Sequence, residues 1–340
     1  MELISTLAYG LKLNTVDKLT DNHVLHIYDV FDQEYVDYIL TKGTPYCIVN
    51  DHLSTPPYHN PIPFYGLPLF AEKDTRIVTD QLEFDNNLST SHCFNFMINK
   101  KQINRFLCIK FVEHFNLTNF DYTWSAADQN FDMSDILKEL DALGPRSPLD
   151  DKTRSAILAP IKLKERFIEF SQEQGIKSKS AIKNYGGNAW TWKNGLNDLF
   201  LKSSISLITE SLRFQQATAF TEKTLYSVLG LTFPIWIGGY NQATEWKRLG
   251  FDTFDDIIDH SYQSYNTLIE RCYYAFANNL ELLTNKSKSA ELRATHQERL
   301  FKNRDLLLKN QLGNFVDQEI NKCSPELKSC MTDVLKYFRE

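Results

Sequence analysis

The chain has 340 residues, and its 43 acidic side chains outnumber its 37 basic ones, for a formal net charge of −6. Hydrophobic residues make up 42% of the chain, which is enough for packed cores and excludes disordered, collagen-like and coiled-coil proteins. The negative charge argues against broad, non-specific nucleic-acid binding, because that affinity comes mostly from counterions that Lys and Arg displace. At roughly 150 residues per domain, the length predicts about two domains.

Neither a membrane segment nor a cysteine framework is expected. The longest mainly apolar stretch, 225–240, falls short of the roughly 20 residues that a membrane helix needs. The first residues lack a basic segment followed by an apolar core, so no signal peptide is predicted and we expect a cytoplasmic protein. The six cysteines include no C-x-x-C pair, which argues against a zinc site and against a disulfide framework.

Short apolar runs bounded by turn-forming residues predict strands in the first part of the chain, at 23–30, 45–50 and 76–84. A further strand at 92–98 is followed by a helix over 102–114, whose apolar residues recur on one face at helical spacing. This strand–helix unit is the building block of an open α/β sheet. A proline-rich loop lies between the third and fourth of these strands.

Residues 119–197 are less regular, and an insertion of short helices is expected there. Its segment 174–195 combines lysines and aromatic residues with a Gly-Gly pair. Such a segment is typical of a solvated loop with docked aromatic side chains, and it is also suited to binding an acceptor molecule. The candidate acceptor-binding residues are Lys177, Lys179, Lys183, Trp190 and Trp192.

Strands and helices alternate in the next part of the chain. Strands are predicted at 204–210 and 233–239, the second ending in Gly238 and Gly239, and helices at 221–230 and 245–251. This alternation is typical of a doubly wound parallel sheet, and therefore of an α/β fold.

The C-terminal part is predicted to be helical, with one long helix from about 289 to 311 and an amphipathic helix over 325–339. The predicted organisation is an N-terminal α/β domain over 1–90, a second α/β domain over 91–320 that includes the insertion, and a C-terminal helix over 321–340.

Charged residues cluster between the strand at 204–210 and the following helix. Glu210 closes the strand, and Thr221-Glu222-Lys223-Thr224 begin the helix. Ligands of open α/β sheets bind outside the carboxyl ends of the strands, so both groups are expected at the ligand edge. Helix N-terminal amides and Lys223 favour a diphosphate, whereas the Glu222 carboxylate suits a pair of ribose hydroxyls.

A simpler interpretation of the same residues needs no ligand. Thr221 is a good helix cap, and an acidic residue in the first turn stabilises a helix by itself. The spacing of these residues is compatible with both interpretations.

The stretch 208–263, ITES…FTEKTLYSVLGLTFPIWIGGYNQATEWKRLGFDTFDDIIDHSYQ, resembles the nucleotide-sugar-binding half of GT-B fold glycosyltransferases. It is most similar to phage and bacterial enzymes with a TEKT…LGF.TF…DESYD pattern, and at greater distance to the α1,3-fucosyltransferases. Two flanking stretches, 94–117 and 298–311, extend the resemblance. It implies two Rossmann-type domains with parallel sheets facing across a cleft, with residues 1–90 on the acceptor side and 91–320 binding the nucleotide sugar.

The resemblance also implies roles for individual residues. Glu222 would bind the ribose of a nucleoside-diphosphate sugar and Lys223 its diphosphate, while Glu210 would support the base or ribose. The expected donor-binding residues are Lys100, Lys101, Arg105, Glu210, Thr221, Glu222, Lys223, Thr224, Gly238 and Gly239. Where the family usually has D-E-S-Y-D, this chain has D-H-S-Y-Q at 259–263, and we expect only a helix cap at Asp259 and a packed Tyr262.

The expected reaction transfers a sugar to an acceptor hydroxyl without a metal or a cofactor. No D-x-D triplet is present, so leaving-group charge would be met by Lys223, Arg105 and helix amides. An inverting enzyme also needs a general base, for which Asp51 is the first choice, although Asp at a strand end is more often a turn cap. The other candidates for this base are Asp29, His52, Asp80 and Glu83.

The acceptor is left open between a hydroxymethylated DNA base, as in phage DNA modification, and a glycan. The basic and aromatic segment 174–195 favours DNA, because such segments track phosphates and stack bases. A non-catalytic nucleotide- or glycan-binding module on the same fold is the alternative function. A Rossmann dehydrogenase is disfavoured, since no G-x-G-x-x-G follows a predicted strand.

Overall fold

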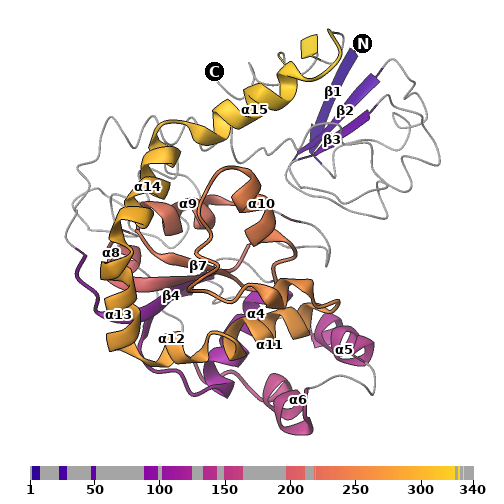
Figure 1. Ribbon diagram of the computed structural model, residues 1–340. Helices are drawn as coiled ribbons and strands as arrows, with labels where there is room; N and C mark the ends of the chain where they lie inside the picture. The colour runs from indigo at the N-terminus through magenta and orange to yellow at the C-terminus, as the bar shows by residue number, and fades with distance from the viewer. Residues whose placement is uncertain are drawn as a thin grey trace, which may run out of the picture.

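The computed structural model has an α/β fold with two parallel sheets (Figure 1). This class agrees with the prediction from alternating strands and helices. The residues that the structure describes are 2–7, 23–28, 47–50, 88–98, 102–124, 133–143, 149–163, 197–210, 218, 220–325, 328–329 and 332.

Three strands near the N-terminus form the smaller sheet. They are β1 (Glu2–Leu7), β2 (His23–Tyr28) and β3 (Cys47–Asn50), and neighbouring strands pair in parallel in that order. β2 and β3 confirm two predicted strands within the described residues, whereas β1 was not predicted. The predicted strand at 76–84 lies outside the described residues.

The larger sheet has four parallel strands in the order β5-β4-β6-β7. The strands are β4 (His92–Ile98), β5 (Phe120–Trp124), β6 (Ser203–Ile208) and β7 (Phe233–Trp236). β4, β6 and β7 confirm predicted strands, although β6 and β7 end before Glu210 and before the two glycines. β5 lies where short helices were expected, and its aromatic residues stack on those of β4, with the Phe94 and Phe120 rings 5.2 Å apart.

Helices cover both faces of this sheet (Figure 1). One core joins the sheet to α4 (Ile103–His114), α5 (Met133–Ala142), α6 (Asp151–Leu158), α11 (Leu268–Ala277) and α12 (Leu280–Thr284). The second core joins it to α8 (Asn197–Leu201), α9 (Glu222–Leu229), α10 (Gln242–Arg248) and α15 (Gln311–Asn321). α14 (Gln297–Leu308) contributes to both cores, through Leu300 to the first and Leu307 to the second.

Strand residues alternate between the two cores because successive side chains point to opposite faces. Phe96 and Leu207, which pair across β4 and β6, face the first core. Asn95 and Ser206 pair one position earlier and face the other way, where the Ser206 hydroxyl donates to the side-chain oxygen Oδ1 of Asn95 at 3.2 Å. Thr232 extends this polar row, its hydroxyl 2.7 Å from that of Ser206.

Helix α4 confirms the helix predicted over 102–114, and its burial extends beyond the face that carries the recurring apolar residues. Every residue from 104 to 112 is buried, because α11 and α6 cover the side of the helix that the sheet does not. Lys110 tolerates this burial because its ammonium donates to the carbonyl of Ala159 at 2.7 Å and pairs with Glu113 at 3.3 Å. The polar residue Lys110 of this helix therefore makes an internal hydrogen bond and does not face solvent.

One long helix was predicted from 289 to 311, and this prediction is wrong. The chain forms α13 (Lys286–Thr295) and α14, which are separated at His296. Arg293 and Arg299 would point roughly 120° apart on one continuous helix of 3.6 residues per turn. The break lets both reach the body of the molecule, where Arg293 bonds the carbonyl of Leu231 and Arg299 bonds Asp252.

The remaining helix predictions differ mainly at their ends. α9 confirms the helix predicted at 221–230, and α10 starts at Gln242, before the predicted residue 245. Of the predicted helix at 325–339, residues 325, 328, 329 and 332 are described and helical. No helix in the described part of the chain is long and apolar enough to cross a membrane.

Candidate functional site

The carboxyl edge of the four-stranded sheet carries the predicted charge cluster. α4 begins beyond the end of β4, and α9 begins beyond the end of β6, so the N-termini of both helices lie at this edge. Arg105 is in the first turn of α4, and Thr221 caps α9 with its hydroxyl oxygen 3.4 Å from the amide nitrogen of Lys223. The predicted convergence of these residues is confirmed.

Glu210 is the buried centre of this cluster, with 1% of its surface exposed. One carboxylate oxygen accepts the Thr221 amide at 3.0 Å, and both threonine hydroxyls, of Thr221 and Thr224, also donate to the carboxylate. Burial raises the pKa of Glu210, while attraction from Lys223 and the threonine donors opposes that rise. Glu210 thus joins the end of β6 to the start of α9.

Glu222 and Lys223 form an ion pair with their charged atoms 2.8 Å apart. The Lys223 side chain is 5% exposed, whereas that of Glu222 is 31% exposed. Burial raises the pKa of Glu222, but attraction from Lys223 and Arg105 outweighs it, so the pKa lies below its ordinary value. Glu222 is therefore ionised at neutral pH, and it is the member of the cluster that solvent reaches most.

Arg105 lies behind this pair and is 1% exposed. Its Nε donates to the carbonyl of Thr209 at 3.4 Å. Burial lowers its pKa, and attraction from Glu222 and Glu210 opposes the change. Two cations and two carboxylates are thus held together at the start of two helices.

Three of the predicted donor-binding residues have structural roles. Thr224 is buried, and its hydroxyl donates to Glu210 and accepts from the Trp236 indole at 3.0 Å, so it has no hydrogen bond to give a donor. Gly238 has φ +76, and a Cβ there would lie 2.5 Å from Leu268. A Cβ on Gly239 would lie 1.9 Å from the Gln242 side-chain oxygen. Both glycines permit a tight turn after β7.

The other predicted site residues lie in parts of the chain that the structure does not describe. The candidate base, Asp51, lies outside the described residues, as do Lys100 and Lys101. The acceptor-binding candidates Lys177, Lys179, Lys183, Trp190 and Trp192 lie outside them too.

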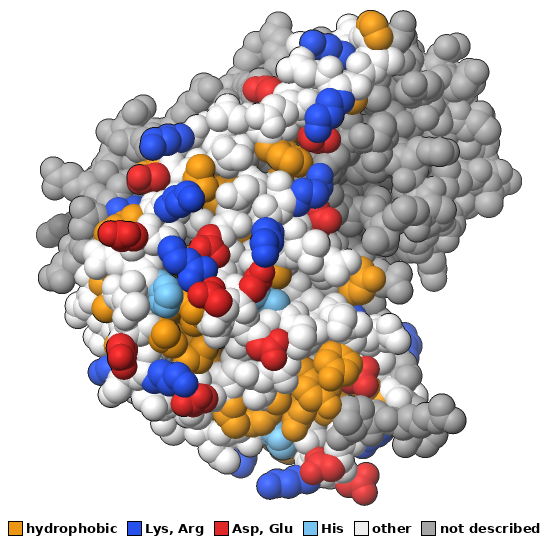
Figure 2. Space-filling view, viewed as in Figure 1, with side chains coloured by type: hydrophobic (Ala, Val, Ile, Leu, Met, Phe, Trp, Pro, Cys, Tyr) orange, Lys and Arg blue, Asp and Glu red, His pale blue; other side chains and the backbone are white. Residues whose placement is uncertain are grey.

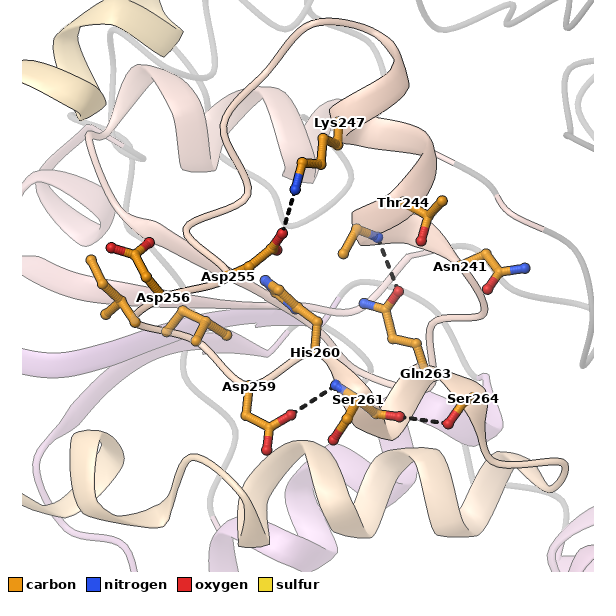
Figure 3. Close-up of a pocket in the computed structure, with 13 residues that line it drawn as sticks. Asn241, Thr244, Lys247, Asp255, Asp256, Asp259, His260, Ser261, Gln263 and Ser264 are labelled. Atoms are coloured by element: carbon orange, nitrogen blue, oxygen red, sulfur yellow. Dashed lines mark hydrogen bonds and ion pairs between the residues drawn. The ribbon is translucent and has the colours of Figure 1, made fainter.

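A pocket of about 740 Å³ opens beside α10, and sequence reasoning did not find it (Figure 3). Its walls are α10, the turn through 252–260 and the short 3₁₀-helix η4 (Ser261–Ser264). Its polar lining residues are Asn241, Thr244, Lys247, Asp255, Asp256, Asp259, His260, Ser261, Gln263 and Ser264. The only signal in the sequence was the D-H-S-Y-Q segment, which forms one of the walls.

That segment has the packed tyrosine that was expected, but the cap residue of η4 is His260 and not Asp259. Asp259 accepts the Ser261 amide at 2.8 Å, and Tyr262 is fully buried. Gln263 accepts the Ala243 amide of α10 at 2.9 Å. His260 contacts the Thr253 carbonyl oxygen through Nε2 at 2.9 Å. His260 and Gln263 therefore hold the walls of the pocket together.

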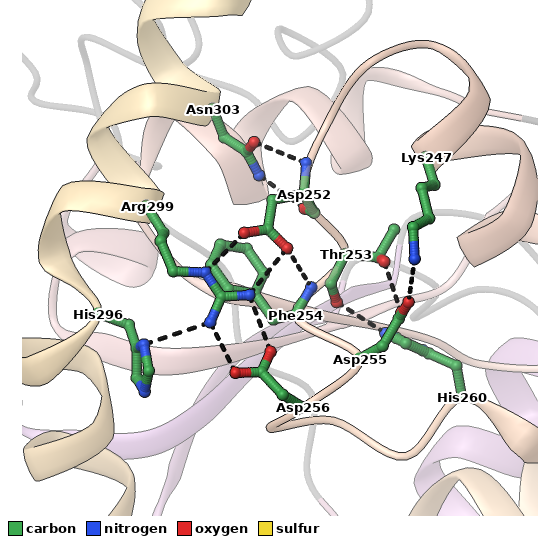
Figure 4. A network of polar contacts seen from close by, with 10 residues as sticks. All are labelled: Lys247, Asp252, Thr253, Phe254, Asp255, Asp256, His260, His296, Arg299 and Asn303. Atoms are coloured by element: carbon green, nitrogen blue, oxygen red, sulfur yellow. Dashed lines mark hydrogen bonds and ion pairs between the residues drawn. The ribbon is translucent and has the colours of Figure 1, made fainter.

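Arg299 holds the turn that forms one wall of the pocket (Figure 4). Its guanidinium pairs with Asp252 at 2.6 Å and with Asp256 at 2.8 Å, and it lies over the Phe254 ring. Asn303 adds two hydrogen bonds to the backbone of Asp252. These contacts fix the 252–256 turn to α14, which was not predicted because they join residues more than 40 positions apart.

Charges elsewhere on the viewed face are mixed. Figure 2 shows Lys and Arg side chains interspersed with Asp and Glu over α13 and α14, without a field of one sign. In the described ranges, no group of three or more His, Cys, Asp or Glu could hold a metal ion. Cys93, Cys108, Cys272 and Cys323 are free thiols.

Comparison of the chain with known protein families, with curated protein sequences and with solved structures found no match in any of the three.

Proposed function

We propose that the chain is a glycosyltransferase that takes a sugar from a nucleoside-diphosphate donor and passes it to an acceptor hydroxyl. The observation that carries the proposal is the meeting of Arg105, Lys223, Glu210 and Glu222 at the carboxyl edge of a parallel sheet. Ligands of open α/β sheets bind at this edge. The resemblance of residues 208–263 to GT-B enzymes supports the donor class.

Each charged group has a distinct part in the proposed donor site. Glu222, the most exposed of the four, accepts hydrogen bonds from the ribose hydroxyls. Lys223 and Arg105 stabilise the diphosphate, whose charge grows as the bond to the sugar breaks. Glu210 holds Thr221 in place and so positions the start of α9. In this proposal the diphosphate charge is stabilised by side chains, without a metal.

The proposal extends to a two-domain GT-B arrangement, with residues 1–90 on the acceptor side and Asp51 as the general base. The parallel pairing of β1, β2 and β3 is compatible with a Rossmann-type N-terminal domain. The acceptor is a glycan or a hydroxymethylated DNA base. A binding module without catalysis is the alternative, and it is distinguished by donor turnover.

A thermal-shift experiment tests donor binding. UDP, GDP, ADP and CDP are titrated against the protein, and a ligand that binds only the native state raises Tm in proportion to ln(1 + [L]/Kd). We expect one of them to bind, and Glu222→Gln to reduce its affinity about tenfold, the loss of roughly 1.4 kcal/mol. Glu270→Gln is the matched control, because Glu270 also lies in the first turn of a Thr-capped helix.

Two results would contradict the proposal. One is the absence of a shift with all four nucleotides, together with no hydrolysis of their sugar conjugates. The other is an equal loss of affinity in Glu270→Gln and Glu222→Gln, which would indicate a general effect on helix ends. Binding without turnover of any nucleotide sugar, with or without acceptors, would favour the non-catalytic module.

A further inference from the structure

The pocket beside α10 contains several polar groups that the fold does not use. Within the described part of the chain, the Thr244 hydroxyl and the Asn241 amide have no hydrogen-bond partner. Asp259 commits one carboxylate oxygen to the Ser261 amide and leaves the other without a partner among these residues. Figure 3 shows Asn241 and Thr244 on one side of the pocket and Asp259 on the other.

His260 adds a buried acceptor to the same wall. The Thr253 carbonyl can only accept, so the His260 Nε2 that faces it must carry the hydrogen in the neutral ring. The lone pair on Nδ1 is then an acceptor, and this atom is buried with no partner in the described structure. Hydrogen-bond donors and hydrogen-bond acceptors thus line the same pocket.

The charge balance of the pocket disfavours an anion. Asp255, Asp256 and Asp259 line it, and Lys247 is the one cation among its lining residues. Lys247 is already paired with Asp255 at 2.8 Å, and Arg299 neutralises Asp256 from outside. One carboxylate, that of Asp259, remains uncompensated within the described residues, so a phosphate or a nucleic-acid backbone would be repelled.

The same pairing disfavours a metal ion. Two of the three carboxylates are engaged by Lys247 and Arg299, and the remaining one would be a single charged ligand, fewer than a divalent cation usually takes. A neutral ligand rich in hydroxyl groups fits better, because each hydroxyl donates and accepts, as carboxylates, amides and imidazoles require. Ala243 and Ile257 offer apolar contact to the C–H faces of such a ligand.

We propose that the pocket bounded by α10, the 252–260 turn and η4 binds a neutral sugar unit. Its volume of about 740 Å³ lies within the range of roughly 300–1,000 Å³ typical of small-molecule sites. The site is separate from the charge cluster, but Trp236 adjoins both. The indole bonds Thr224 on one side, and its ring lies 5.5 Å from that of His260 on the other. Sugar binding to this pocket does not depend on transferase activity.

Direct titration of the full chain tests this site. The probes are glucose, galactose, N-acetylglucosamine, ribose and maltotriose, with inorganic phosphate as the anionic comparison. Binding is measured by calorimetry. We expect saturable binding of at least one sugar and none of phosphate. Asp259→Asn and Thr244→Val should each reduce the affinity for that sugar about tenfold. Thr244→Val disturbs no hydrogen bond within the described residues. Asp141→Asn, an exposed carboxylate on α5, should bind as the wild type does.

A second arm identifies the source of the sugar. Each nucleoside diphosphate is compared with its glucose conjugate in the Asp259→Asn protein. If the substitution weakens binding of the conjugate only, the pocket binds the sugar of the donor. If it weakens binding of free sugars only, the pocket binds a separate glycan. The proposal is overturned if no probe or conjugate depends on Asp259 and Thr244, or if phosphate binds more tightly than every sugar. A normal response to the nucleotides alone would leave the proposed donor site intact.

Discussion

The two edges of the four-stranded sheet each hold a buried arginine, and the two are stabilised differently. At the amino edge, Arg293 is fully buried and donates to the carbonyls of Leu201, Gly230 and Leu231 at 2.8 to 2.9 Å. Burial lowers its pKa to about 10, and no carboxylate opposes that change within the described structure. At the carboxyl edge, Arg105 is attracted by Glu210 and Glu222.

This difference separates a structural arginine from a candidate binding arginine. Backbone carbonyls are fixed by the fold, so Arg293 joins the ends of α8 and α9, and among the described residues it has no counter-ion for a ligand to replace. The carboxyl edge instead carries charged side chains, one of them exposed to 31%, at the start of two helices. An anion that enters there can compete with carboxylates for the same cations. Stability should therefore depend most on the amino edge, and ligand binding on the carboxyl edge.

The largest expected effect is on the amino edge. Arg293→Met removes the donor to three buried carbonyls and should lower the free energy of unfolding by about 3–5 kcal/mol. Urea denaturation measures this loss. Nucleotide binding to the protein that remains folded should be unchanged. A loss below about 1 kcal/mol, or a selective loss of nucleotide affinity, would contradict the structural role of this arginine.

The next effect tests the turn beyond β7 at the carboxyl edge. Gly238→Ala places a Cβ 2.5 Å from Leu268 at φ +76, so unfavourable backbone geometry adds to overpacking. We expect a loss of about 2–4 kcal/mol. Gly250→Ala is the control, because φ is +95 there but the nearest atom is the flexible end of Gln311, at 2.9 Å. It should lose only about 1–2 kcal/mol, and equal losses would show that packing against Leu268 does not matter.

Much of the carboxyl edge could be predicted from the sequence because its signals are local. Thr221 precedes a helical pattern with an acidic residue in the first turn, so the cap and the helix start were placed. The strand before them was also predicted, although it ends at Ile208 and not at Glu210. The rule that ligands bind beyond the carboxyl ends of parallel strands placed Glu210 and this helix start at the ligand edge, and the resemblance implied that Arg105 lies there too.

The parts that were missed depend on contacts between distant residues. The burial of α4 is caused by α11 and α6, and the break at His296 is explained by the separate partners of Arg293 and Arg299. The hydrogen bond from Trp236 to Thr224 was not predicted because Trp236 lies on another strand. The pocket combines α10, a turn and η4, and no pattern within any one of these segments indicates a cavity.

A smaller effect concerns Glu210 and pH. Because burial raises its pKa above the ordinary 4.5, the native state holds this proton more tightly than the unfolded state does. Its contribution to stability is therefore full below pH 4.5 and falls as pH rises toward the folded pKa. Glu210→Gln should remove that fall, and it should cost about 1–3 kcal/mol at neutral pH because the amide cannot accept all the threonine donors. Urea unfolding between pH 4 and pH 8 measures both changes, and an unaltered slope would contradict the assignment.

The smallest effect is expected at His260, on the wall of the proposed sugar pocket. Burial lowers its pKa below 6.5, although its contact with Thr253 and attraction from Asp255 and Asp259 oppose the shift. A base with a lowered pKa binds protons more readily in the unfolded state, so its contribution to stability is lost as pH falls from 6.5 toward the folded pKa. His260→Gln should flatten this loss by an amount on the order of 1 kcal/mol or less.

His114 provides the matched comparison for that measurement. Its pKa is also lowered by burial, so it adds a loss of the same sign over the same pH range. Unfolding free energies at pH 7.5 and pH 5.5 should therefore differ most in the wild type, less in His260→Gln or His114→Gln, and least in the double variant. If His260→Gln keeps the full wild-type difference, the imidazole is not held neutral. The unpartnered Nδ1 acceptor would then be lost from the pocket, and the sugar site would depend on Asp259, Asn241 and Thr244 alone.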